Sequence, residues 1–166
     1  MPAPHTSTLM TVEPQWIDYN GHLNMAYYNV LMDRGADQLF EIFGFGPEYR
    51  ERTNHTTFSA EFHVCYLREV HAGDQVYVTS QLLDFDKRRF HFYQELFHAD
   101  GWLSATGEGL GLHIDLSGPK VAPMFEDTLS AMEALFDVHK ALPWPDRAGR
   151  RIGLGRSTGR RSPAQA

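Results

Sequence analysis

The spacing of apolar residues changes along the chain from a strand-like to a helical pattern. Residues 11–17 read as a short strand, and residues 18–21 have the composition of a turn. Over residues 24–43 apolar positions recur every three or four residues; Asn24 stands where a cap is expected and Gly44 where a helix ends. The other face of this segment is charged. The pattern therefore predicts an amphipathic helix with one side buried.

The central part of the chain then alternates between apolar and polar residues. Turn residues divide it into four predicted strands, at 58–70, 75–84, 89–98 and 102–115. The sequence Ala99-Asp100-Gly101 is the strongest hairpin signal in the chain. Residues 126–142 return to helical spacing, which Pro143 ends.

This order of elements is typical of an α+β fold. The apolar face of an antiparallel meander must be covered, and the helix at 24–43 is the only early candidate. We therefore expect a curved antiparallel sheet wrapped around a long central helix, with a second helix near the C-terminus. Residues 1–146 form a single predicted domain, and residues 147–166 form a basic tail rich in Gly, Ser and Arg.

Composition narrows the class of protein. The chain has 166 residues, of which 42% are hydrophobic, so it can build a core and is not globally disordered. No apolar run approaches the roughly 20 residues of a membrane span, and the first ten residues lack the plan of a signal peptide. We expect a cytoplasmic protein without a membrane partner. A single Cys excludes a disulfide framework and a thiolate zinc site.

The charge is unevenly distributed. Six arginines and no acidic residue follow Asp146, so residues 1–146 hold nine basic and 21 acidic residues, a net charge of −12. So acidic a body argues against nucleic acid as a partner. The tail is expected to be partly mobile. Alternatively, its first part packs on the body and contacts an anionic ligand.

Polar side chains crowd the junction before the predicted helix. Asp18, Asn20, His22 and Asn24 stand at alternate positions, and Gly21 permits a bend. A helix N-terminus offers unpaired backbone N–H groups, which can stabilise an oxyanion, and a carboxylate beside it makes a plausible hydrolytic site. The structural alternative is that Asn24 only caps the helix, Asp18 braces the turn and His22 is a surface histidine.

Motifs at this junction resemble those of a known family. The string Asp18-x-Asn20-Gly21-His22-x-Asn24-x-x-Tyr27-Tyr28 resembles the signature of hot-dog-fold thioesterases of the 4-hydroxybenzoyl-CoA thioesterase type, and Asp-x-Asn-x-His is similar to the active-site loop of plant acyl-ACP thioesterases. Longer strings resemble the betainyl-CoA thioesterases of carnitine breakdown: Trp16-Ile17-Asp18-Tyr19-Asn20-Gly21-His22, Tyr66-Leu67-Arg68-Glu69-Val70, Gln81-Leu82-Leu83-Asp84 and Ala148-Gly149-Arg150-Arg151-Ile152.

The resemblance implies a hot-dog fold and hydrolysis of a short acyl-CoA, most closely betainyl-CoA to glycine betaine and CoA. It makes Asp18 the catalytic carboxylate, acting as general base or as nucleophile. The backbone N–H of Met25 would polarise the thioester carbonyl, and Gly21 would form the turn. Asn20 and His22 would orient Asp18 or the water. No cofactor is implied, because CoA is part of the substrate. The one Gly-x-Ser-x-Gly string, at residues 155–159, lies in the predicted basic tail and not at a strand-to-helix turn, which disfavours a triad hydrolase.

Further residues are candidates for binding the substrate. Aromatic faces could hold a trimethylammonium acyl group, or the same rings could fill the core. The candidate rings are those of Trp16, Tyr19, Tyr27, Tyr28 and Phe58. Basic side chains could hold the CoA phosphates, or lie exposed in a turn; they belong to Arg68, Lys87, Arg88 and Arg89. A catalytic role for Glu69 is no better supported than an ion pair with a neighbour. His63, His91 and His113 lack metal-ligand spacing, so no metal is expected.

The resemblance also implies a homodimer with its active sites at the interface, and a tetramer stays possible. Three alternatives remain open at this point. The chain could hydrolyse an aromatic or medium-chain acyl-CoA, it could be a non-catalytic module that binds an acyl-CoA or another metabolite, or it could be a hot-dog dehydratase that uses His22 as its base.

Overall fold

The computed structural model describes residues 2–154 of the chain. Two short strands and a 3-10 helix come first: β1 (His5–Thr6), β2 (Met10–Thr11) and η1 (Pro14–Trp16). The helices α1 (Met25–Ile42) and α2 (Pro47–Thr53) follow. The remaining elements are β3 (His55–Tyr66), β4 (Gln75–Phe85), β5 (Arg89–His98), β6 (Leu103–Asp115), β7 (Lys120–Val121) and α3 (Glu126–His139).

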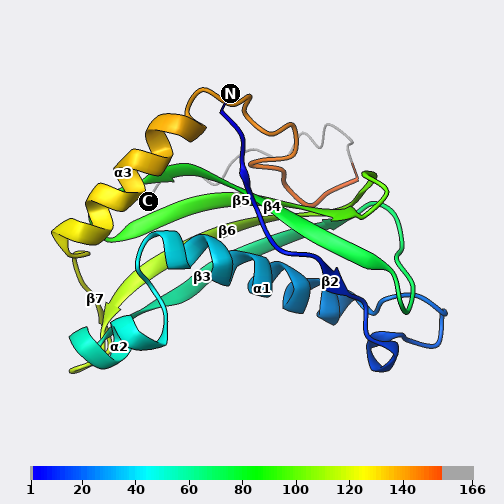
Figure 1. Cartoon of the computed structure of the whole chain (residues 1–166), viewed down its shortest axis with the longest axis horizontal. Helices are drawn as coiled ribbons and strands as arrows, with labels where there is room; N and C mark the ends of the chain where they lie inside the picture. Colours follow the sequence, from blue (N-terminus) through cyan, green and yellow to red (C-terminus); the bar gives the residue numbers. More distant parts are fainter. Residues whose placement is uncertain (1, 155–166) are drawn as a thin grey trace.

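The strands form one antiparallel sheet that curves around α1 (Figure 1). Its order is β1-β4-β5-β6-β3, with β2 also paired to β4 and β7 to β6. Among residues 2–154 the long strand β3 pairs on one side only, with β6, so it forms an edge of the sheet. Its register shifts at a bulge between Ser59 and Glu61. The predicted α+β order and the curved sheet around a long helix are confirmed.

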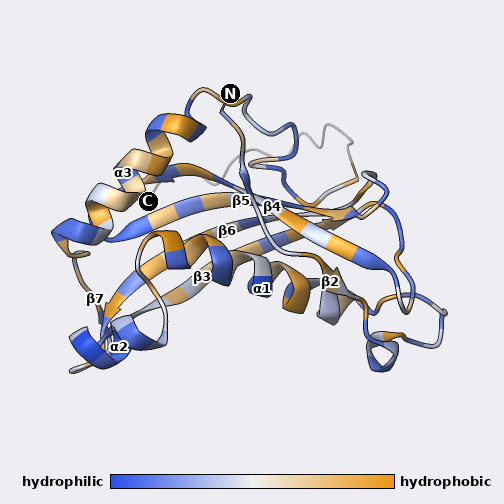
Figure 2. Cartoon of the chain, viewed as in Figure 1, coloured by the Kyte–Doolittle hydropathy of each residue, from blue (hydrophilic) through white to orange (hydrophobic). Residues whose placement is uncertain are grey.

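The helix α1 forms where the apolar spacing predicts it. The Asn24 side chain accepts a hydrogen bond from the Ala26 N–H (3.0 Å), and Gly44 follows the helix end with a positive φ of 78°. The face toward the sheet is buried and includes Leu31, Met32 and Leu39. Hydrophobic and hydrophilic residues alternate around this helix and along the strands (Figure 2). Burial of this apolar face fixes the helix start, and with it the loop before it.

Glycines on β6 make room for aromatic rings between the sheet and α1. A Cβ atom at Gly109 would lie 2.4 Å from the Phe92 ring and 3.1 Å from the Phe62 ring. A Cβ at Gly111 would lie 2.2 Å from the Phe90 ring. The rings occupy the space that side chains would otherwise fill, so these glycines determine how the aromatic part of the core packs.

The structure differs from the sequence prediction at the N-terminal end of the chain. The strand expected at 11–17 is wrong beyond Thr11, because Pro14 removes a backbone donor and begins η1 instead. The helix α2 was not predicted; it has seven residues, too few for a clear periodic pattern, and lies between Gly46 (φ 136°) and the left-handed Asn54. Among the described residues, no helix is long and apolar enough to span a membrane.

The segment after α3 crosses the face of the sheet opposite α1. Gln81 donates from its side-chain amide to the Pro143 carbonyl (3.4 Å), and the Trp144 ring lies edge-on to His91. The Gly149 N–H donates to the Glu108 carboxylate (2.7 Å). The first part of the basic tail thus packs on the body, while residues 155–166 lie outside the described part of the chain.

Candidate active site

The loop between η1 and α1 is closed on itself by backbone hydrogen bonds. Ile17 and Leu23 form an isolated β-bridge, and the Asp18 N–H donates to the His22 carbonyl (3.1 Å). The Leu23 N–H donates to Val70 (2.9 Å), which ties the loop to the segment that follows β3. The loop therefore enters α1 at a fixed position rather than as a free connection.

The tip of this loop is a tight turn. The Gly21 N–H donates to the Asp18 carbonyl (3.0 Å), and Gly21 has a φ of 83°, a conformation that other residues adopt only with strain. The turn brings both ends of the Asp18–His22 segment together, as the sequence predicts for a turn glycine.

The Asp18 carboxylate is half-buried and held by the loop and the helix start. One oxygen accepts from the Asn20 N–H (2.8 Å), and the other lies 3.4 Å from the side-chain amide nitrogen of Asn24, which donates to it. The same Asn24 side chain caps α1 through the Ala26 N–H. Asn24 thus links the carboxylate to the positive end of the helix macrodipole, which favours negative charge there.

A cavity of about 500 Å³ opens beside this carboxylate. The loop contributes Asp18, Tyr19, Asn20 and His22 to its lining, and α1 contributes Met25. Met25 is the first residue of α1, so its backbone N–H has no acceptor within the helix. Tyr19 is 97% exposed and Met25 63% exposed, so the cavity is open to solvent in the single chain. The contacts that hold the Asp18 carboxylate and cap α1 therefore leave space for a ligand beside that carboxylate.

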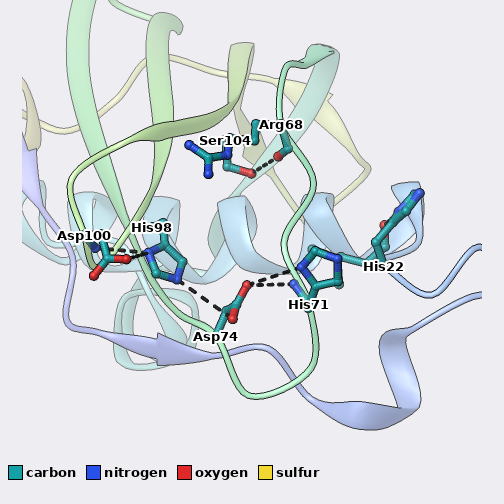
Figure 3. A network of polar contacts seen from close by, with 8 residues as sticks. His22, Arg68, His71, Asp74, His98, Asp100 and Ser104 are labelled. Atoms are coloured by element: carbon teal, nitrogen blue, oxygen red, sulfur yellow. Dashed lines mark hydrogen bonds and ion pairs between the residues drawn. The ribbon is translucent and has the colours of Figure 1, made fainter.

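The opposite wall of the cavity comes from the end of β3 and the segment after it, and it includes Tyr66, Arg68 and Glu69. This wall is itself held in place (Figure 3). The Ser104 hydroxyl donates to the Arg68 carbonyl (2.7 Å), and the Arg68 guanidinium lies 3.9 Å from the centre of the Trp102 ring. Further along, the His71 N–H donates to the Asp74 carboxylate (2.8 Å).

Two tyrosines connect this wall to α1. Tyr28 is buried and packs edge-on against Tyr66, with ring centres 5.1 Å apart. The Tyr66 hydroxyl donates to the Met25 carbonyl (3.4 Å), and burial raises the pKa of the Tyr66 phenol. The sequence reasoning did not select Tyr66 as a site residue, although it stands at the start of the Tyr66–Val70 string.

The other predicted site residues are less close to the carboxylate. His22 lines the cavity with its Nδ1 atom 3.4 Å from the Leu23 carbonyl oxygen, and the described residues show no hydrogen bond between its ring and Asp18. Trp16 is buried and stacks on Tyr27 at 5.5 Å between ring centres, with the Arg34 guanidinium over its ring. Neither Trp16 nor Tyr27 lines the cavity.

Four predicted binding residues lie elsewhere on the sheet. Phe58 is 47% exposed on the edge strand β3, paired in register with Leu112. Lys87 and Arg88 lie in the β4–β5 turn, at the opposite end of β4 from the turn that carries Asp74. Arg89 begins β5 and pairs with Asp86. Within one chain, only Arg68 of the predicted phosphate ligands borders the cavity. The described residues hold no group of three His, Cys, Asp or Glu placed to bind a metal.

The family of the chain follows from comparison with known proteins. The family model of the thioesterase-like superfamily matches residues 12–132, and the chain belongs to this superfamily. The fold and the family make the protein a hot-dog thioesterase.

Two curated relatives with a named activity are similar to most of the chain. The chain is 39% identical over 144 residues to the betainyl-CoA thioesterase of Pseudomonas aeruginosa, covering 86% of this chain and 91% of that one. It is 33% identical to the L-carnitine dehydrogenase/betainyl-CoA thioesterase of Rhizobium meliloti, covering 87% of this chain and 29% of that longer protein.

Two solved structures share the fold over nearly their whole length. A hypothetical protein of Staphylococcus aureus in complex with CoA has a TM-score of 0.86 at 26% identity, with 93% of this chain and 97% of that chain covered. A putative thioesterase of Pseudomonas putida has a TM-score of 0.78 at 31% identity, with 92% and 97% covered.

Proposed function

We propose that this chain hydrolyses betainyl-CoA to glycine betaine and CoA. The observation that carries the proposal is the Asp18 carboxylate, held by Asn20 and Asn24 beside the first turn of α1 on an open cavity. The similarity to the Pseudomonas aeruginosa betainyl-CoA thioesterase over 86% of the chain supports the choice of acyl group.

The chemistry needs an oxygen nucleophile and a place for negative charge. In one route Asp18 removes a proton from water as the water oxygen attacks the thioester carbon; in the other the carboxylate attacks directly, and water cleaves the resulting anhydride. The Met25 N–H, at the start of α1, would donate to the carbonyl oxygen as it becomes negative. In both routes the C–S bond breaks after the first attack on the carbonyl carbon, and CoA leaves as its thiolate; in the second route this step forms the anhydride that water then cleaves. A thiol pKa of roughly 8.5 makes strong acid assistance unnecessary.

The neighbouring polar residues have supporting roles in this proposal. Asn20 and Asn24 fix the carboxylate by donating to its two oxygens. His22, on the lining of the cavity, would orient the attacking water or the bound thioester. Arg68, on the opposite wall, is placed to contact the CoA portion of the substrate.

We also propose that the active form is a homodimer joined through β3. In the described part of the chain this strand of 12 residues pairs on one side only, so the backbone groups of its other side are available at the sheet edge, and its residues Phe58 and Tyr66 are exposed. Antiparallel pairing of two β3 strands about a two-fold axis would extend the sheet across both chains. Light scattering after gel filtration should give twice the mass of the chain, or four times if two dimers associate; a monomer would contradict this assembly.

A thiol-release assay tests the proposed activity. The purified protein would be given betainyl-CoA, acetyl-CoA, benzoyl-CoA and octanoyl-CoA in parallel, with CoA release followed by a thiol reagent. The highest kcat/KM is expected for betainyl-CoA. Activity confined to benzoyl-CoA or octanoyl-CoA would refute the substrate, and binding of these esters without thiol release would refute catalysis.

A further inference from the structure

The bulge in β3 places both ends of this strand on one face of the sheet. Ser59 and Phe62 lie on either side of the bulge, and both line a separate cavity of about 310 Å³ against α1, so both face that helix. Because side chains alternate along a strand, His55 at one end and Tyr66 at the other belong to the same face. Their contacts agree, since Tyr66 packs on a tyrosine of α1 and the His55 ring stacks on the buried His113.

This arrangement restricts how two copies of β3 can pair. In an antiparallel pair, residues directly opposite each other point to the same face of the sheet. The register that sets His55 of one chain opposite Tyr66 of the other meets this condition and pairs all 12 residues of the strand. A shift by one residue would set side chains that face α1 against side chains of the other face, and a shift by two would leave residues unpaired. The bulge thus favours the full-length register, since without it the two ends would face opposite sides.

The single chain leaves the middle of β3 open. Residues 58–61 are consecutive exposed positions, whereas most of the strand on either side of them is half-buried. In the full-length register these residues lie opposite residues 60–63 of a second copy. The second copy therefore covers the part of the strand that the described residues of one chain leave exposed.

The length of β3 determines which chain's His55 lies at which active site. The two ends of a strand of 12 residues are about 36 Å apart. Tyr66 lines the cavity at Asp18 and donates to the Met25 carbonyl, so the His55 of the same chain is far from that cavity. Directly opposite residues of paired strands have Cβ atoms only about 4.5–5.5 Å apart. The partner's His55 therefore lies within contact distance of Tyr66.

The His55 ring is held in one orientation. Its Nδ1 atom lies 2.7 Å from the Thr53 carbonyl oxygen, which can only accept, so Nδ1 carries a hydrogen and donates it. The ring stacks on His113 with 5.1 Å between ring centres, and Phe125 packs edge-on against it at 5.0 Å. A ring with these three contacts is a rigid surface rather than one that adapts to a ligand.

The position of this ring in the assembly gives it a role in the choice of substrate. The cavity at Asp18 is open to solvent in the single chain, and Tyr66 on its wall is 44% exposed. An acyl group whose carbonyl lies at the Met25 N–H could therefore extend past Tyr66 into solvent. We propose that His55 of the partner subunit closes the cavity at this point and restricts the active site to short acyl groups. This inference rests on the proposed function, which includes the pairing through β3.

Removal of the His55 ring tests its role as a wall. His55→Ala should raise the ratio of kcat/KM for octanoyl-CoA to that for betainyl-CoA by about tenfold or more, because one methylene group accommodated in a pocket is worth about that factor. His55→Phe keeps a ring at this position and should keep the wild-type ratio. His63→Ala, which removes an imidazole from the other face of the same strand, is the matched control and should also keep it. An unchanged ratio in His55→Ala would overturn the inference, since loss of stability alone would lower both rates equally.

A heterodimer shows which subunit supplies the ring. One chain would carry Asp18→Asn and the other His55→Ala, and the mixed species would be purified through two different tags. If His55 acts across the interface, the site that keeps its Asp18 also keeps its His55. The heterodimer should then show the wild-type ratio for the two substrates at about half of the wild-type turnover, by the symmetry of a two-fold dimer. The ratio of the His55→Ala homodimer would overturn the assignment to the partner.

A pair of cysteines tests the register without any enzymatic activity. In the full-length register the free Cys65 lies opposite the partner's Thr56, with Cα atoms about 4.5–5.5 Å apart, a distance that a disulfide can span. Thr56→Cys should therefore form a covalent dimer on mild oxidation, while the wild type and Thr57→Cys, whose new side chain is on the other face, should not.

This measurement separates the two possible failures. A covalent Thr56→Cys dimer whose wild-type parent hydrolyses none of the thioesters would refute the proposed function and uphold the pairing of His55 with Tyr66. Hydrolysis of betainyl-CoA by a protein that gives no such covalent dimer would uphold the function and overturn the inference.

Discussion

Asn24 has two roles that can be separated by substitution. Its Oδ1 atom caps α1 through the Ala26 N–H (3.0 Å), and its Nδ2 group donates to the Asp18 carboxylate (3.4 Å). Asn24→Ala removes both contacts. Asn24→Asp keeps an acceptor for the cap and adds a favourable charge at the helix N-terminus, but it places a second carboxylate against Asp18.

The expected magnitudes differ accordingly. Loss of the cap in Asn24→Ala should lower the free energy of unfolding by about 1 kcal/mol, and Tm by about 2–4 °C for a chain of this size. Asn24→Asp should keep Tm within about 2 °C of wild type, because Asp and Asn are similar caps. Its turnover should nevertheless fall by about 10- to 100-fold, since repulsion displaces the Asp18 carboxylate from its position beside the thioester.

Thermal unfolding by circular dichroism and thiol release from betainyl-CoA would be measured on the same preparations. The decisive comparison is between the two variants. If Asn24 only capped the helix, turnover would fall only in the variant whose Tm falls. An Asn24→Asp protein with both wild-type Tm and wild-type turnover would refute the role of Asn24 in holding the Asp18 carboxylate for the proposed reaction.

Three further predictions concern packing, binding and pH. Gly109→Ala should lower the free energy of unfolding in urea by about 1–3 kcal/mol, because its Cβ would lie 2.4 Å from the Phe92 ring; Gly118→Ala, with no atom within 4 Å, is the control, and equal stability of the two would contradict this packing. Tyr19→Ala should leave Tm unchanged and raise KM, since this ring is 97% exposed and borders the cavity; an unchanged KM would remove Tyr19 from the site. Burial lowers the pKa of His113 below the ordinary histidine value of 6.5. As the pH falls through that value, the unfolded chain therefore binds more protons than the folded chain, and the folded state loses stability. Urea unfolding at pH 7.5 and 5.5 should therefore show a smaller loss for His113→Gln than for wild type, and equal losses would contradict the burial effect.

Sequence patterns predicted the parts of the fold that have a strong period. The predicted strand at 89–98 has the same bounds as β5, and the helix predicted at 24–43 agrees with α1 and its Asn24 cap to within one residue at each end. Elements defined by long-range pairing were missed. β1 consists of two residues that become a strand only because they pair with β4, and no local signal marks them.

The contacts within the candidate site could be predicted as far as they are local in sequence. Asp18, Asn20 and Asn24 meet because one turn and one cap bring them together, and both have sequence signatures. Tyr66 reaches the site from the end of β3, far from the loop in sequence. Its position depends on the packing of the sheet against α1, which periodicity does not specify.

Replacement of the Asp18 carboxylate by the amide of Asn tests the catalytic proposal most directly. The variant keeps an acceptor for the Asn20 N–H and should fold, with Tm changed by no more than a few degrees after loss of about 0.3–1 kcal/mol of charge interaction with α1. Its kcat for thiol release from betainyl-CoA should fall by about 100-fold or more, the lower range for a positioned acid or base. A folded Asp18→Asn protein with the wild-type kcat would show that this carboxylate does not act on the thioester.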